Sequence, residues 1–308
     1  MPSIRARLLT FMMKNRHLFK GNQDKVDWST YESVLMFRRQ VEEGAAKFGK
    51  LPNGIEAQAV KIGDMYAEWI TPVNAPKDKV MLYFHGGGYI SGTCAAHRAI
   101  VAKFVKNSDV PALLFEYRLA PEHRYPAAVE DAVSAYRWLL GEGVLPENIV
   151  FIGDSAGGGL ALATLLVARD QEMPLPSAVV AYSPVTDYTC SGETYQTNAK
   201  TCFAPNGTGP AFARHYAGEH DLKDPYISPL FGDLHALPPM LIYAGSHETL
   251  LSDATRYAEK AKSAGVNVTL NIGEGLFHCY PAMAPMFPEA TQAMQEICQF
   301  VRKYVGKR

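Results

Sequence analysis

Residues 149–157 read IVFIGDSAG, and this stretch carries the strongest structural signal in the chain. Its first four residues are a continuous apolar run, which predicts a short strand buried on both faces. A G-x-S-x-G pattern follows at once, and residues 160–169, rich in alanine and leucine, predict a helix. In this strand–turn–helix context the pattern predicts a cramped turn that projects the Ser155 hydroxyl, with glycines where side chains would collide with neighbouring backbone.

Similar apolar runs recur along the chain and alternate with helical patterns. We expect further strands at residues 80–84, 112–115, 178–181, 240–243 and, with an alternating pattern that fits a strand nearer an edge, 266–272. Apolar residues at helical spacing predict helices at residues 129–140, 160–169, 254–264 and 289–304. This alternation predicts an α/β protein with a mostly parallel sheet flanked by helices. Because parallel sheets bind ligands at the carboxyl ends of their strands, we expect the site there.

Composition and charge exclude several classes of protein. The chain has 308 residues, of which 47% are hydrophobic and 20% charged, a balance typical of a globular protein. Its 30 Lys and Arg against 31 Asp and Glu give a net charge of −1, so we expect no nucleic-acid partner. No apolar run approaches the roughly 18 residues of a membrane helix, so no integral membrane association is expected. Five cysteines without a C-x-x-C pair indicate free thiols in a reducing compartment, and we expect a cytoplasmic protein.

Two regions do not follow the alternation of strands and helices. Residues 1–50 look helical but have no strand partner, and residues from about 187 to 230 are irregular and rich in glycine and proline. A long connection of this kind usually forms a lid or binding loop. We therefore expect a catalytic domain at residues 51–308 with a helical cap made by residues 1–50 and about 187–230. Within residues 1–20 we expect an amphipathic helix that packs on the body, covers a pocket or lies on a membrane surface.

A second glycine-rich segment, HGGG at residues 85–88, follows the strand expected at 80–84. Three consecutive glycines cost conformational entropy, so the bare backbone must be needed there. Backbone N–H groups that hold the oxyanion of a tetrahedral intermediate are such a need, worth about 3–4 kcal/mol for each donor. A phosphate cradle is the alternative, but no G-K-[ST] follows the glycines. We expect an oxyanion hole, with the N–H of Ala156 as a further donor.

A serine nucleophile needs a general base, and α/β-hydrolases place the acid next in the chain and the histidine last. His278 follows the last expected strand, in a loop that can return over Ser155, and is the expected base. Chain order removes the histidines before the serine, namely His17, His85, His97 and His123. The others fall in the expected cap or too early for the last position: His215, His220, His235 and His247.

The acid of the predicted triad is expected just after the strand at 240–243, within SHETLLSD at residues 246–253. Glu248 and Asp253 both fit this position. Glu248 is closer to the strand end, where a loop can direct it at the imidazole, whereas Asp253 is expected to open the next helix, whose dipole favours a carboxylate. Glu248 is therefore the first choice and Asp253 the alternative. The acid would hold the tautomer of His278 and stabilise its imidazolium form.

Together these motifs resemble the hormone-sensitive-lipase-like branch of the α/β-hydrolases, the bacterial family IV esterases. The resemblance covers most of the chain after about residue 55. It rests on HGGG (85–88), YRLAPEH (117–123), PAAVED (126–131), GDSAGG (153–158) and DPYISPL (224–230). It implies an α/β-hydrolase fold with a helical cap, a small-molecule ester of a short- to medium-chain acid as substrate, and no metal or organic cofactor.

The resemblance also implies roles for individual residues. Ser155 matches the nucleophile and His278 the general base, and the matches to the oxyanion-hole donors are Gly87, Gly88 and Ala156. Gly86 matches the glycine that shapes the turn, and the residues matching the scaffold beside the site are Tyr117, Arg118 and Glu122. Most members carry Asp-Pro-Leu at the acid position and some use glutamate; here the residues are Glu248, Thr249 and Leu250.

Other activities remain open at this level. A lactonase, deacetylase or amidase would share every catalytic residue, and only a substrate panel separates them. A ligand receptor on the same fold is the alternative from another class, but the receptors of this branch in plants have lost the histidine that His278 matches. A homodimer is also open, because strand edges and helices can pair between copies.

Overall fold

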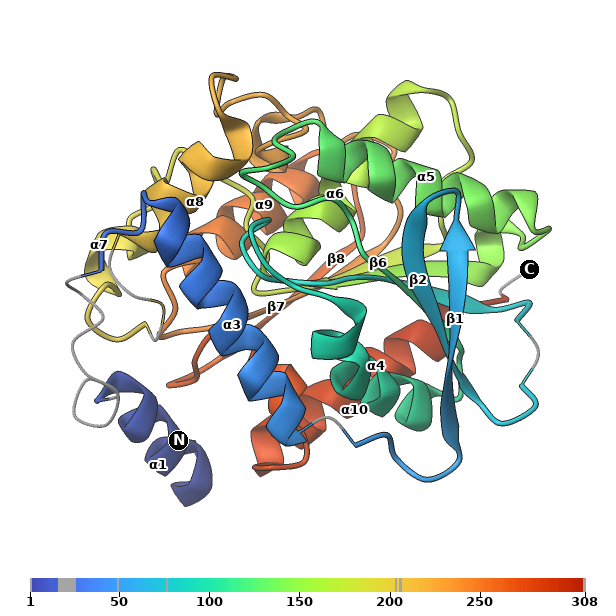
Figure 1. The fold of residues 1–308 in the computed structure, drawn as a ribbon, viewed down its shortest axis with the longest axis horizontal. Helices are drawn as coiled ribbons and strands as arrows, with labels where there is room; N and C mark the ends of the chain where they lie inside the picture. The colour runs from blue at the N-terminus through green and yellow to red at the C-terminus, as the bar shows by residue number, and fades with distance from the viewer. Residues whose placement is uncertain are drawn as a thin grey trace.

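The computed structural model describes residues 2–15, 26–48, 50–75, 77–202, 204 and 207–306, and its strands form one sheet (Figure 1). The eight strands of this part lie in the order β1-β2-β4-β3-β5-β6-β7-β8. Their bounds are Ile55–Ile62 (β1), Met65–Pro72 (β2), Val80–Phe84 (β3), Ala112–Phe115 (β4), Ile149–Asp154 (β5), Ala178–Tyr182 (β6), Met240–Gly245 (β7) and Val268–Gly273 (β8). Strands β3 to β8 pair in parallel, so the predicted α/β fold is confirmed.

The sequence analysis did not place the first two strands. Strands β1 and β2 form an antiparallel hairpin that adds to the sheet through β4. Most of β1 is exposed, and β2 buries the charged residue Glu68 beside Arg98, so neither strand shows the apolar run of the central strands. Strand β8, expected near an edge, is the edge strand at the opposite end of the sheet.

Helices cover both faces of the sheet. The long ones are α1 (Ile4–Lys14), α3 (Tyr31–Phe48), α4 (Cys94–Ser108), α5 (Ala127–Gly141), α6 (Ala156–Asp170), α8 (Thr208–Ala217), α9 (Leu251–Ser263) and α10 (Pro288–Tyr304). The short ones in the described residues are α7 (Thr194–Thr197) and the 3₁₀ helices Pro146–Asn148, Pro229–Phe231 and Tyr280–Met283. Helices α5, α6 and α9 pack on one face, and α4 and α10 on the other.

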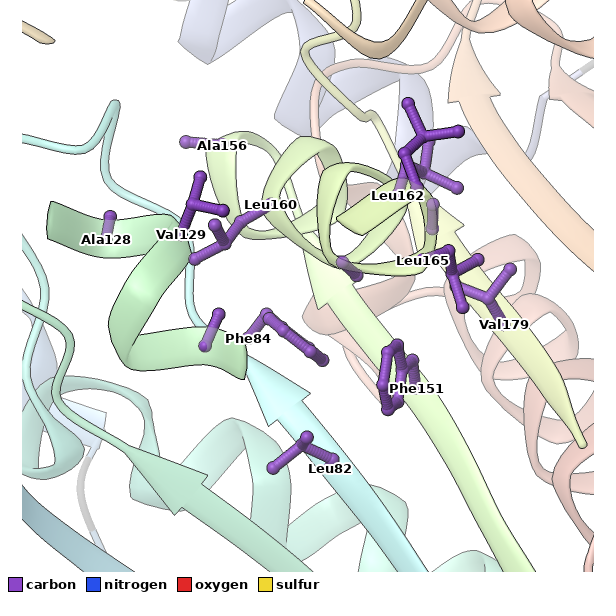
Figure 2. Packing of buried hydrophobic residues seen from close by; sticks show 14 of the residues in the cluster. Leu82, Phe84, Ala128, Val129, Phe151, Ala156, Leu160, Leu162, Leu165 and Val179 are labelled. Atoms are coloured by element: carbon purple, nitrogen blue, oxygen red, sulfur yellow. The ribbon is translucent and has the colours of Figure 1, made fainter. Parts of the chain in front are cut away.

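The alternation of strand side chains divides the core in two. In β3, Leu82 and Phe84 face α5 and α6, whereas Met81 and Tyr83 face α4 and α10. Figure 2 shows the first of these cores, where Phe84 and Phe151 on the strands lie below α6. Because almost all of α6 is buried, the helix that begins directly after Ser155 is fixed at the centre of the molecule.

Residues 1–50 and about 187–230, the two regions that do not follow the alternation of strands and helices, contact each other. Trp28 and Phe37, before and within α3, lie 6.2 and 5.4 Å from the ring of Phe212 in α8, measured between ring centroids. Nε2 of His215, also in α8, lies 2.9 Å from the carbonyl oxygen of Trp28. The division into a cap and a catalytic domain at residue 50 stays a prediction.

Helix α1 packs elsewhere, on the body of the protein. Ala6 is fully buried in the core that contains α4 and α10, and the Thr10 hydroxyl donates to the carbonyl of Gly275. The helix expected within residues 1–20 thus ends at Lys14. Residues 16–20 of the expected segment, which include His17, fall outside the described residues.

Candidate active site

Ser155 lies in a strained turn between β5 and α6. Its backbone has φ of 53° and ψ of −122°, a combination that costs energy for a residue with a side chain. A Cβ atom on Gly157 would lie 2.1 Å from the carbonyl oxygen of Phe84, and one on Gly153 would lie 2.4 Å from that of Gly157. The two glycines of the G-x-S-x-G pattern are therefore required by the close approach of backbone.

Ser155, His278 and Glu248 form one chain of hydrogen-bonding groups. The Ser155 Oγ atom lies 2.9 Å from Nε2 of His278, and Nδ1 of the same ring lies 2.5 Å from Oε2 of Glu248. The three residues follow β5, β8 and β7, so the carboxyl ends of three parallel strands, on the same edge of the sheet, bring them together. With a proton on Nδ1 donated to the carboxylate, Nε2 can accept the proton of the serine hydroxyl.

The carboxylate of Glu248 is buried and held from both sides. Its Oε1 atom accepts hydrogen bonds from the N–H of Gly245 at 2.7 Å and from the hydroxyl of Ser183 at 3.0 Å. The Ser183 oxygen in turn accepts from the N–H of Cys279, next to His278. Asn198, just after α7, donates to the carbonyls of Ser246 and Glu248. The loop that carries Glu248 is thus held by hydrogen bonds from Gly245 and Ser183 at the strand ends and from Asn198 in the 187–230 region.

Asp253, the alternative acid, has a different environment. It lies in the first turn of α9, as expected, and is fully buried. Its Oδ2 atom accepts the N–H groups of Thr186 and Asp187 at 2.8 and 2.9 Å, so the carboxylate ties down the loop after β6. Burial raises the pKa of Asp253 to about 8. Glu248, and not Asp253, is the carboxylate that the structure pairs with His278.

The HGGG loop presents bare backbone beside the serine. Gly87 and Gly88 have φ of 122° and 66°, which side chains rarely allow, and a Cβ on Gly88 would lie 2.4 Å from the Phe212 ring. The N–H of Gly86 donates to the Asp154 carboxylate. Within the described part of the chain, the N–H groups of Gly87, Gly88 and Ala156 donate to no acceptor. Three backbone donors are thus available close to Ser155.

A cavity of about 370 Å³ opens over Ser155 and His278. Gly87 and Gly88 form part of its wall, and the rest is mainly apolar or aromatic: Phe37, Val41, Val185, Tyr188, Phe212 and Leu250. The described residues that line it include one acid, Asp154, whose carboxylate accepts from the N–H of Gly86 and the hydroxyl of Tyr83, and no Lys, Arg or Glu. The cavity therefore suits a small, uncharged organic molecule.

The chain matches known proteins over nearly its whole length. Residues 81–282 match the family described as alpha/beta hydrolase fold. An acetyl-hydrolase from Streptomyces hygroscopicus is 36% identical over 287 residues, which cover 92% of this chain and 95% of that protein. A crystal structure of an esterase from the bacterial hormone-sensitive lipase family is 36% identical with a TM-score of 0.88, covering 99% of this chain and all of that one. This chain belongs to the hormone-sensitive-lipase-like α/β-hydrolases.

Other relatives agree on the chemistry. An esterase from Acinetobacter venetianus is 33% identical and covers 80% of this chain and 82% of its own. A crystal structure of an esterase/lipase from an uncultured bacterium is 37% identical, with a TM-score of 0.90 over 99% of this chain and all of that one. The protein is a carboxylic ester hydrolase, and its substrate is a small-molecule ester.

Several residues that position the site of this esterase were missed by the sequence analysis. Ser183, Asn198 and Phe212 contact the predicted site residues from segments far away in sequence, and no local motif marks them. Asp154, which accepts from the N–H of Gly86, was also missed, although it lies inside the G-x-S-x-G motif and is therefore marked by a local pattern. Of the residues expected to be scaffold, Tyr117 donates to the carbonyl of His85, and Arg118 pairs with Asp131.

No cluster of three His, Cys, Asp or Glu residues that could hold a metal ion occurs in the described ranges. Likewise, none of the helices described is both long and apolar enough to cross a bilayer. The five cysteines, all of them described, are free thiols.

Proposed function

We propose that this esterase cleaves its substrate by acyl transfer to Ser155, with His278 as general base and Glu248 as the acid that orients the imidazole. One observation carries the proposal: the continuous chain from the Ser155 hydroxyl through both ring nitrogens of His278 to a buried carboxylate, at 2.9 and 2.5 Å. This arrangement of nucleophile, base and orienting group is what serine catalysis requires.

The reaction then proceeds in two steps. His278 takes the proton of Ser155 as its oxygen attacks the ester carbonyl, and the N–H groups of Gly87, Gly88 and Ala156 hold the resulting oxyanion. The tetrahedral intermediate collapses, and the alcohol leaves with the proton from His278. Water, deprotonated by His278, attacks the acyl-enzyme in the same way and releases the acid and the free serine.

We infer that the preferred substrates are uncharged esters of short- to medium-chain acids. The cavity of about 370 Å³ is of the size that holds a small ligand, and its wall has apolar side chains beside the serine. The similarity to an acetyl-hydrolase points the same way. The predicted cap of residues 1–50 and about 187–230 would act at this cavity through Phe37, Val41 and Phe212, which contribute to its wall.

A series of p-nitrophenyl esters from acetate to palmitate tests both parts of this proposal. We expect kcat/KM to be highest within the acetate-to-octanoate range and at least tenfold lower for palmitate. Ser155→Ala should lower kcat by about 10⁵- to 10⁶-fold on every ester, with an unchanged thermal midpoint. Hydrolysis by the variant at a near-normal rate would refute the nucleophile, and a maximum at palmitate would refute the chain-length preference.

Location and assembly are separate proposals. We propose a cytoplasmic protein on the basis of its free thiols, and a homodimer on the basis of its edge strand β8. Sedimentation velocity at micromolar concentration tests the assembly, with a single monomeric species as the result that would refute the dimer.

A further inference from the structure

Helix α1 has two apolar faces, of which only one packs on the protein. Ala6 and Thr10 are buried, and Leu9 and Met13 pack partly against the core around α10. The opposite face exposes four large apolar side chains, Ile4 by 84%, Leu8 by 59%, Phe11 by 61% and Met12 by 48%. We call these four residues the outer stripe. Exposed apolar side chains gathered on one helix face mark a site of interaction.

Basic residues flank the outer stripe on both sides. Successive helical residues are rotated by about 100°, so Ile4, Leu8, Phe11 and Met12 fall within an arc of about 100°. On the same wheel Arg7 and Lys14 border the arc on one side, and Arg5 borders it on the other. Helix α1 contains no acidic residue. An apolar stripe between rows of bases is the pattern of helices that lie in a lipid interface.

A groove continues this surface on the side of Arg7 and Lys14. It has a volume of about 730 Å³, and the residues that line it are Pro2, Ile4, Arg7, Leu8, Thr10, Phe11, Lys14, His247 and Gly275. Glu289 and Glu274 are acids of the described part of the chain that lie near the helix. Glu289 is engaged by the backbone and hydroxyl of Ser3, and Glu274 is close enough to His247 to influence its titration. The charge at the stripe itself is therefore positive.

The helix is held in place and does not have to fold in order to bind. Ser3 caps its start, accepting from the N–H of Ala6, and ties it to Glu289 of α10. Thr10 ties its middle to the loop between β8 and His278. A docking surface that is already ordered loses little conformational entropy on binding.

We propose that the outer stripe and its flanking bases dock this esterase onto the surface of an anionic phospholipid bilayer. The stripe enters the boundary between headgroups and acyl chains, and Arg5, Arg7 and Lys14 contact lipid phosphates. A second copy of the chain is a poorer occupant, because a two-fold contact would place the same basic helix against itself and bring like charges together. The proposal is independent of the proposed catalytic residues.

Cosedimentation with vesicles tests the proposal. Vesicles of 70% phosphatidylcholine and 30% phosphatidylglycerol are compared with pure phosphatidylcholine at 50 and 500 mM salt. We expect binding to the anionic vesicles that is at least tenfold stronger than to the neutral ones and is lost at high salt, since each base near the surface adds about fivefold. Leu8→Glu/Phe11→Glu should lower the binding at least tenfold, and Arg5→Gln/Arg7→Gln, which leaves Lys14 in place, should reduce its salt dependence.

Leu145→Glu is the matched control, because Leu145 is also exposed, by 50%, but lies outside the stripe. It should leave vesicle binding unchanged, and all variants should hydrolyse a soluble nitrophenyl ester at the wild-type rate. Absence of binding to anionic vesicles by the wild type, or equal binding by Leu8→Glu/Phe11→Glu, would overturn the proposal. So would sedimentation data in which that double variant turns a dimer into a monomer, since the stripe would then be an interface between copies.

Discussion

At the scale of single residues, the strained serine is fixed by backbone contacts from three directions. The Ser155 N–H donates to the carbonyl of Tyr182, and the Ser155 carbonyl accepts from the N–H groups of Gly159 and Val185. These bonds hold the left-handed φ that local preference disfavours. The strain projects the hydroxyl towards His278, so the local cost of the turn is linked directly to the geometry of the site.

The choice between the two acids can be tested by a pair of amide substitutions. Glu248→Gln should lower kcat for p-nitrophenyl butyrate by about 10³- to 10⁴-fold, because the neutral amide no longer stabilises the imidazolium of His278. Asp253→Asn should keep kcat within about threefold of the wild type, because its remaining oxygen can still accept from Thr186 and Asp187. The reverse order of the two effects would make Asp253 the catalytic acid.

At the scale of elements, one side chain joins α3 to the HGGG loop. Arg38 donates to the carbonyls of Ile90 and Ala120 at 2.6 and 2.9 Å and to both oxygens of Glu122 at 2.7 Å. This guanidinium lowers the pKa of the Glu122 carboxyl to about 2. The N–H of Ile90 donates to the carbonyl of Gly87, so Arg38 acts on the oxyanion loop through a single residue.

Replacing Arg38 should lower kcat more than it lowers the free energy of unfolding. Arg38→Ala should lower kcat about tenfold with a smaller change in KM, because the expected oxyanion donors lose their support, while a half-exposed ion pair contributes at most about 1 kcal/mol to folding. Arg38→Lys should restore part of kcat. Arg39→Ala, at the exposed neighbouring position, is the control and should match the wild type. Equal loss of kcat in both alanine variants would show that α3 is only a structural element.

Sequence alone was informative where the signal is local. The apolar runs of β3, β5 and β6 and the two glycine motifs have patterns that can be read within ten residues. Chain order predicted His278, whose Nε2 lies 2.9 Å from the Ser155 Oγ atom. The hairpin β1–β2 was missed because one of its strands is largely exposed and the other buries a charged residue. Arg38 and Ser183 were missed because their partners, Ile90 and Glu248, lie 52 and 65 residues away.

At the scale of the whole molecule, the sheet separates two hydrophobic cores. The buried carboxyl of Asp253, in α9, lies on the side of the core that contains α5, α6 and α9. Asp253 anchors the loop after β6, and Asp187 in that loop pairs with Arg256 of α9. The pKa of Asp253 rises from its ordinary value of 3.8 to about 8, because burial penalises the charged form. Folding and the protonation of this group are therefore linked.

The stability of the protein should reflect this link. Between about pH 4 and 8 the folded state binds a proton at Asp253 that the unfolded state has released, so this contribution is complete below pH 4 and is lost as the pH rises through 8. Relative to Asp253→Asn, the free energy of unfolding of the wild type should fall by about 2 kcal/mol from pH 6 to 8. Urea denaturation of both proteins at several pH values measures this fall in the free energy of unfolding. Parallel curves for the two proteins would mean that Asp253 does not titrate in this range.

The central claim is that Ser155 is activated by its contact with His278, and covalent labelling tests it most directly. A fluorophosphonate probe reacts with a serine only where a base activates the hydroxyl, and peptide mass spectrometry locates the adduct. We predict one adduct per chain, on Ser155, absent in Ser155→Ala and formed at least 10³-fold more slowly in His278→Ala. An unlabelled wild type, or an adduct that persists in Ser155→Ala, would contradict the account.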